Sequence, residues 1–225
     1  MTDGCRCVVL VSGGGTNLQA LLDHAAAGRL GATIAGVISN RPEAYALERA
    51  ATAGVTTRVV DHTAFPDRES YDEVLAEAVA ALAPELVVLA GYMRILTPAF
   101  VTRFADRMIN VHPSLLPAFR GLHTHRKAIE AGCRIHGTTV HFVTNDLDAG
   151  PIIAQAATGI APDDTPDSLA RRVQSLEHRL LPQTVRWFAD GRLSLREGRV
   201  RLNGEDPIPG ELIAPAPDTL RGETE

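Results

Sequence analysis

Short apolar, β-branched segments alternate with amphipathic segments through the first half of the chain. Val8 to Val11, Ile34 to Ile38 and Leu86 to Ala90 have the composition of buried strands. Leucine, valine and alanine recur at helical spacing over 71–82, and Pro84 ends that pattern. Strands that alternate with helices pair in parallel. The sequence therefore predicts an α/β fold with an open, doubly wound, mostly parallel sheet flanked by helices.

The second half has shorter and less regular elements. A helix is expected to begin at Thr165-Pro166, because a hydroxyl cap followed by proline suits a first turn, and Pro182 is expected to restart or kink that helix. Residues 193–202 have the pattern of a small hairpin. Three further strands are expected, the last two of them paired: Met108 to Val111, Thr138 to Val143 and Ile152 to Ala156.

The sequence shows no internal repeat and no linker that divides the chain. We therefore expect residues 1–206 to form one domain. Residues 207–225 are rich in proline, glycine and acidic side chains, so we expect a mobile tail there.

Composition and charge narrow the classes of function. The 22 basic and 27 acidic side chains give a net charge of -5, which argues against bulk nucleic-acid binding but not against one bound phosphate. Three cysteines cannot form a full disulfide framework, and no secretory or membrane-spanning segment is recognisable. The expected compartment is the cytoplasm, with no membrane partner.

A glycine-rich loop, Gly13-Gly14-Gly15-Thr16-Asn17, separates the first expected strand from the first expected helix. Glycine lets backbone N–H groups approach a ligand, and a helix N-terminus favours an anion. The loop is neither a G-x-G-x-x-G fingerprint nor a P-loop, because the lysine is missing. The pattern favours a phosphate site, and the alternative is a tight turn before a helix.

A second group of residues suits acyl transfer. Asn110 and His112 point to one side of an extended segment, and Pro113 keeps His112 extended. The amide can hold a developing oxyanion, and the imidazole can move a proton. For a lone histidine, however, the pattern alone favours a structural turn. A carboxylate from the loop containing Asp146 and Asp148 would orient the ring, although this loop is also typical of a solvated turn.

The histidines raise the question of a metal. His123 and His125 have a spacing that can chelate, and His112, His136 and His141 are further candidates. The sequence has no H-E-x-x-H and no paired C-x-x-C, which disfavours a catalytic metal. It also has no G-x-S-x-G, which disfavours a serine nucleophile.

Five segments, in their order and spacing, resemble the glycinamide ribonucleotide transformylase family: SGGGTNLQALLD, VVLAGYMRILTPAF, NVHPSLLPAFRGLHTH, HGTTVHFV and LDAGPIIAQ. The resemblance runs from about Val8 to about Gly191. N-x-H-P-S-L-L-P is shared by the wider formyltransferase superfamily, whereas G-L-H-T-H and the short chain point to this branch. The resemblance implies a formyltransferase fold with a Rossmann-like N-terminal half. It implies a phosphate- and nucleotide-binding half over about 1–104 and a catalytic and folate half over 105–206.

The same resemblance implies an activity and a catalytic trio. The reaction would move the formyl group of 10-formyltetrahydrofolate to the amine of N1-(5-phospho-D-ribosyl)glycinamide, in purine biosynthesis, without a metal. The trio falls on Asn110, His112 and Asp148. Asn110 and protonated His112 would stabilise the oxygen that becomes negative, and His112 would also pass a proton toward the departing folate nitrogen. Asp148 would orient the imidazole and favour its protonated form.

The resemblance further implies binding residues. The phosphate loop falls on Gly15, Thr16 and Asn17, and another substrate contact falls on Glu177. The resemblance implies small-molecule substrates and no nucleic-acid partner. It is compatible with either a monomer or a homodimer. Relatives often have G-N-G-S-N where this chain has G-G-G-T-N, which puts the rigidity of the loop in doubt. The folate contacts fall on Arg68, Met93, Arg94, Ile95, Leu96, Asn110, Thr144, Asn145, Asp146, Leu147 and Asp148.

Three other functions compete with this interpretation. Formylation of methionyl-tRNA would call for an RNA-contacting domain and a basic surface, and the chain is short and acidic. A hydrolase that releases formate from the same folate could use the same trio, but that branch usually carries an extra N-terminal domain. A non-enzymatic nucleotide-binding module would leave the acyl-transfer residues idle.

Overall fold

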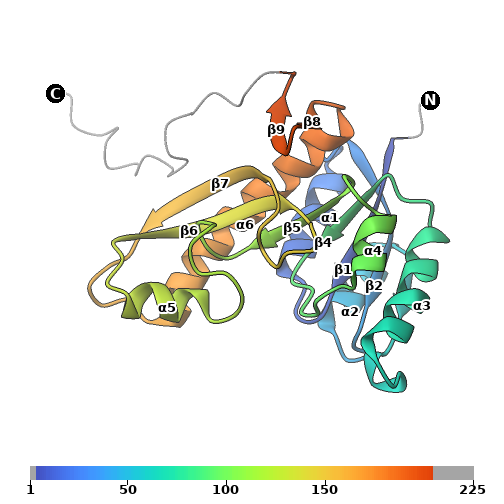
Figure 1. The fold of residues 1–225 in the computed structure, drawn as a ribbon, viewed down its shortest axis with the longest axis horizontal. Coiled ribbons are helices and arrows are strands. Elements are labelled where there is room, and N and C mark those ends of the chain that lie inside the picture. Colours follow the sequence, from blue (N-terminus) through green and yellow to red (C-terminus); the bar gives the residue numbers. More distant parts are fainter. Residues whose placement is uncertain (1–3, 205–225) are drawn as a thin grey trace.

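A seven-stranded sheet forms the centre of the computed structural model, which describes residues 4–204 (Figure 1). The strand order is β3-β2-β1-β4-β5-β6-β7. The first five strands in this order pair in parallel, and β6 and β7 are antiparallel. The bounds are β1 (Cys5–Val11), β2 (Ala32–Ser39), β3 (Thr57–Val59), β4 (Leu86–Leu89), β5 (Met108–His112), β6 (Ile135–Phe142) and β7 (Ile152–Gly159).

Helices cover both faces of the sheet, as predicted for a doubly wound α/β fold. On one face, α1 (Thr16–Ala26), α2 (Tyr45–Thr52) and α6 (Pro166–Ala189) pack in one hydrophobic core. On the other face, α3 (Arg68–Ala80) and α4 (Pro98–Arg103) form a second core around the fully buried Tyr71 and Phe100. Short α5 (Thr124–Glu130) lies against α6, and η1 (His62–Ala64) is a single 3-10 turn.

The expected strands of the second half are present, and β6 and β7 pair as predicted. The small hairpin consists of β8 (Leu193–Arg196) and β9 (Arg199–Leu202). The tail expected at 207–225 lies outside the described residues. Within residues 4–204, no helix combines the length and the apolar character needed to cross a bilayer.

Pro182 is predicted to restart or kink helix α6. The helix does not restart, since it runs as one element from Pro166 to Ala189, and the kink stays a prediction. The helix begins as expected, with the Thr165 hydroxyl accepting a hydrogen bond from the Ser168 N–H. An internal proline costs a helix about 3 kcal/mol. Leu180, Leu181 and Val185 flank it and are buried, and each such burial stabilises by about 1.5–3 kcal/mol, which offsets that cost.

Candidate active site

The loops after β1, β4 and β5 meet at one edge of the sheet, because these three strands are parallel neighbours. Ser12, at the end of β1, connects two of them directly. Its hydroxyl accepts a hydrogen bond from the Met93 N–H at 2.8 Å and donates one to Asn40 Oδ1 at 2.6 Å. Strand β5 brings Asn110 and His112 to the same edge. The sheet therefore gathers the residues that the sequence singled out.

His112 and Asp148 form the pair that acyl transfer calls for. The imidazole Nδ1 lies 3.4 Å from Asp148 Oδ2, and each side chain is only 8% exposed. The other ring nitrogen, Nε2, lies 3.1 Å from the backbone oxygen of Phe119. Both nitrogens thus face acceptor oxygens to which a ring N–H can donate. The Gly121 N–H donates to Asp148 Oδ2 at 2.9 Å and helps to hold the carboxylate in place.

Asn110 is held by a histidine that sequence reasoning considered only as a metal ligand. Asn110 and His141 lie directly opposite each other in the antiparallel β5–β6 ladder, and Asn110 Nδ2 is 3.2 Å from His141 Nε2. His141 Nδ1 donates to the Phe142 carbonyl at 2.8 Å, which leaves Nε2 as the acceptor for the amide. Burial lowers the pKa of His141, so the ring is neutral at pH 7. The amide therefore has a fixed orientation.

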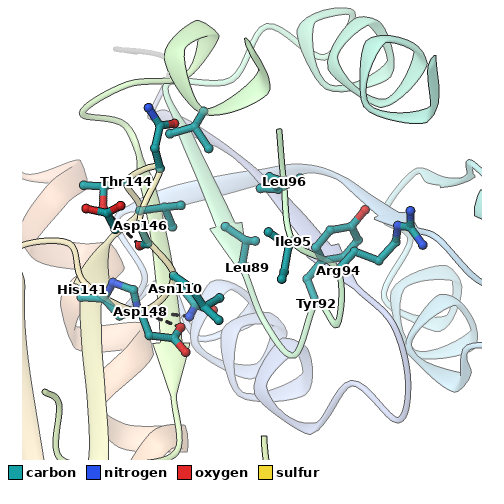
Figure 2. Close-up of a pocket in the computed structure, with 14 residues that line it drawn as sticks. Leu89, Tyr92, Arg94, Ile95, Leu96, Asn110, His141, Thr144, Asp146 and Asp148 are labelled. Atoms are coloured by element: carbon teal, nitrogen blue, oxygen red, sulfur yellow. Dashed lines mark hydrogen bonds and ion pairs between the residues drawn. The ribbon is translucent and has the colours of Figure 1, made fainter. Parts of the chain in front are cut away.

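A pocket extends from this group toward the segment after β4. Figure 2 shows Asn110, His141 and Asp148 gathered on one side, with Tyr92 and Arg94 on the other. Of the predicted folate contacts, nine line the pocket: Arg94, Ile95, Leu96, Asn110, Thr144, Asn145, Asp146, Leu147 and Asp148. Five further lining residues were not among the predicted folate contacts, namely Leu89, Tyr92, Val101, His141 and Val143.

Two predicted folate contacts are not brought into this pocket. Arg68 is the first residue of α3, and its Nη2 lies 3.8 Å from Glu69 Oε1 on the surface. The Met93 side chain is 62% exposed, although its backbone N–H is bound by Ser12. Both assignments stay predictions.

The glycine loop and α6 form a second group at the same edge. Gly15 has φ +71° and precedes α1. The Thr16 hydroxyl accepts a hydrogen bond from Gln174 Nε2 at 2.9 Å, and Asn17 Nδ2 donates to Glu177 Oε2 at 2.7 Å. Gln174 and Glu177 are three residues apart on α6, so they share one face. The structure therefore joins the four residues predicted to bind the phosphorylated substrate.

Glu177 is a buried carboxylic acid with a raised pKa. It is 7% exposed, and burial raises its pKa to about 7, which the Asn17 amide only partly offsets. Asn17 Oδ1 is buried and has no hydrogen-bond partner among the described residues. A buried oxygen without a partner is costly, so it is suited to accept a hydrogen bond from a ligand.

The histidine-rich segment does not assemble a metal centre. His136 Nε2 lies 3.2 Å from His125 Nδ1, and burial lowers the pKa of both rings, to about 4 for His136. His123 is instead the exposed N-cap of α5. Within the described part of the chain, no three histidine, cysteine or acidic side chains are grouped so that they could share a metal ion.

The chain is similar in sequence and in structure to known formyltransferases. The model of the formyl transferase family matches residues 5–185. Phosphoribosylglycinamide formyltransferase of Escherichia coli is 48% identical over 198 residues, which cover 88% of this chain and 93% of that protein. The Haemophilus influenzae protein of the same name is 43% identical over 89% of this chain and 94% of its own length.

A solved structure agrees with these sequences. Glycinamide ribonucleotide transformylase 1 of Symbiobacterium toebii superimposes with a TM-score of 0.87 at 48% identity, covering 90% of this chain and 95% of that one. The family match covers most of the chain and includes β5, the pocket lining and α6 as far as residue 185. The chain belongs to the formyl transferase family.

Proposed function

We propose that the chain is a phosphoribosylglycinamide formyltransferase of purine biosynthesis. It transfers the formyl group of 10-formyltetrahydrofolate to the amine of N1-(5-phospho-D-ribosyl)glycinamide, giving the N2-formyl product and tetrahydrofolate. The observation that carries the proposal is the contact of His112 with Asp148, which lines a pocket together with Asn110 beside the loops predicted to hold the two substrates. The reaction takes place in the cytoplasm, where free cysteines such as Cys5, Cys7 and Cys133 persist.

Asn110 supplies one hydrogen bond to the reacting oxygen. The substrate amine attacks the formyl carbon, and the carbonyl oxygen gains negative charge in the tetrahedral intermediate. One amide hydrogen of Asn110 is directed to His141 at 3.2 Å, and the other is free to donate to this oxygen. An oriented donor needs no rearrangement during the reaction, which is why such groups stabilise transition states strongly.

His112 supplies the second interaction and moves a proton. Its protonated ring stabilises the negative oxygen, and a proton passes from the attacking amine to the departing folate nitrogen as the carbon–nitrogen bond to the folate breaks. Asp148, at 3.4 Å, stabilises the imidazolium and orients it. No formyl-enzyme forms, because the amine attacks the donor directly.

The two substrates occupy the two groups of residues at the sheet edge. The substrate phosphate binds the N–H groups at Gly15, Thr16 and Asn17, where the dipole of α1 favours an anion. Glu177 contacts the ribose. The folate occupies the pocket between residues 94–96 and 144–148, where the backbone of the first segment pairs with the pterin.

A turnover assay tests the proposal. Purified protein is given 10-formyltetrahydrofolate with and without N1-(5-phospho-D-ribosyl)glycinamide, and folate absorbance and the formylated product are measured. We expect folate consumption only with the ribonucleotide, with one formylated product per folate. Consumption without the ribonucleotide would indicate a formate-releasing hydrolase instead. Absence of turnover in both mixtures would contradict the assigned reaction.

A further inference from the structure

Helix α2 supports the glycine loop from behind. The Ala46 N–H donates to the Gly13 carbonyl at 3.0 Å, and Arg49 Nε donates to the Gly14 carbonyl at 2.8 Å. Two consecutive carbonyls of the loop are therefore turned toward α2. Ala46 and Arg49 lie three residues apart on one face of that helix, so the support is part of its regular geometry.

The orientation of the carbonyls determines where the loop presents its N–H groups. Both peptide bonds of this glycine run are trans, since the cis bond of the described chain joins Leu116 and Pro117. In a trans peptide the C=O and the following N–H point in opposite directions. With the Gly13 and Gly14 carbonyls on α2, the N–H groups of Gly14 and Gly15 point away from α2, toward the side where an anion would lie.

Arg49 is itself held in place by two further contacts. Its Nη1 donates to Gln19 Oε1 on α1 at 3.0 Å, and its guanidinium carbon lies 4.9 Å from the centre of the Tyr45 ring. The planar guanidinium thus bridges the loop, α1 and α2 with a fixed geometry. It also places a positive charge behind the loop, which adds to the field of the α1 N-terminus.

The three glycines of the loop depend on this support because they have no side chains to hold them. A Cβ at Gly13 or Gly14 would meet nothing within 4 Å, so these two residues have open space where a side chain would lie. Only Gly15 is packed, since a Cβ there would lie 2.5 Å from the Ala46 Cβ. The G-G-G-T-N sequence put the rigidity of the loop in doubt, and the hydrogen bonds from α2 restrain its backbone.

We propose that Arg49 is a positioning residue for the phosphate of the ribonucleotide substrate. It acts through the Gly14 carbonyl by fixing the N–H of Gly15, one of the groups proposed to bind the anion. This inference rests on the proposed function. Arg49 would act through the loop backbone and without direct contact with the phosphate.

Arg49→Met tests the role through a comparison of two amine substrates. With the ribonucleotide, we expect KM to rise about tenfold with kcat within about twofold, because the loss of one charge-assisted hydrogen bond, about 1.4 kcal/mol, changes affinity about tenfold. With glycinamide riboside, which lacks the phosphate, Arg49→Met and the wild type should have the same kcat/KM. Arg49→Lys keeps a positive donor, so its KM should lie between those of the wild type and the methionine variant.

Controls separate positioning from general damage. Arg186→Met removes a helical arginine whose Nε faces Asp190 at 3.5 Å on α6, and its KM should not change. An equal loss with ribonucleotide and riboside, or a lysine variant no better than methionine, would overturn the proposal. If the wild type lacks turnover, the reaction is misassigned. The loop is then tested with inorganic phosphate by NMR of the residue 14 and 15 amides, where a tenfold weaker affinity for Arg49→Met supports the role and equal affinity refutes it.

Discussion

Glu177→Gln should stabilise the free protein while weakening its binding of the ribonucleotide. The carboxyl is 7% exposed and accepts one hydrogen bond, from Asn17. Ionising it in this surrounding costs free energy because one amide does not replace the lost water. Glutamine has the same shape, keeps an oxygen for the Asn17 amide and carries no charge. The variant therefore removes the cost of ionisation and keeps the local packing.

The size and pH dependence of the effect follow from the raised pKa of Glu177. Its carboxyl keeps the proton up to about pH 7 in the folded chain, against an ordinary pKa of 4.5. The folded state thus holds more protons than the unfolded state between these values, so wild-type stability falls as pH rises through this window. One unit of pKa shift corresponds to 1.36 kcal/mol, so the shift of the Glu177 pKa from 4.5 to about 7 lowers the free energy of unfolding by about 3 kcal/mol once the pH is above 7.

Thermal unfolding of both proteins between pH 5 and pH 8.5 measures this difference. The melting temperature of Glu177→Gln should exceed that of the wild type by about 6–12 °C at pH 8, and the gain should shrink toward pH 5. Glu73→Gln, an exposed change in α3, should show no such trend. A difference that does not vary with pH, or a less stable variant at pH 8, would refute the assignment of a costly ionised Glu177.

Three further predictions concern the reaction and the pocket. His112→Ala should lower kcat by about 10²–10⁴-fold, the usual contribution of general acid–base catalysis, and a fully active variant would remove the proposed proton transfer. Gly150→Ala would place a Cβ 1.8 Å from the Phe142 carbonyl, so we expect a displaced 144–148 loop, a raised folate KM and destabilisation in thermal melts; an unchanged folate KM would contradict this. Asp72→Ala leaves the Thr97 N–H, now bound at 2.5 Å, without its acceptor, and should cost about 1–3 kcal/mol in urea unfolding. Asp72→Asn, which keeps an acceptor, should cost less.

The architecture could be predicted from the sequence because its signals are local. Val8 to Val11 and Leu86 to Ala90 are apolar over their whole length, as central strands of a parallel sheet must be. Residues 71–82 carry helical spacing in a single segment. The continuity of α6 through Pro182 could not be predicted in this way, because the burial that stabilises the helix there depends on contacts with distant elements.

The site could be predicted only where one short motif contains it. Asn110 and His112 are two residues apart, so the pattern predicts their common direction, and Asp148 came from the family resemblance. The role of His141 needs the antiparallel β5–β6 register that places it opposite Asn110, 31 residues earlier. Such a register is set by the packing of the whole sheet and has no local signal.

Arg49 illustrates the same limit. It reaches a carbonyl 35 residues earlier in the chain. In the sequence it is one arginine of an amphipathic helix, and such a residue is ordinarily exposed to solvent. Only the packing of α2 against the loop distinguishes it.

The parts of the site differ in how freely they can be exchanged. Strand β5 is hydrogen-bonded on both sides, parallel to β4 and antiparallel to β6, so backbone pairing sets the spacing between Asn110 and His141. Asp148 lies on a connecting loop, with a φ of +49° that side chains rarely adopt. A designer who wants a different formyl donor could graft a new 144–147 segment and leave Asp148 and the Asn110 amide untouched. Altering the amide would mean rebuilding the sheet.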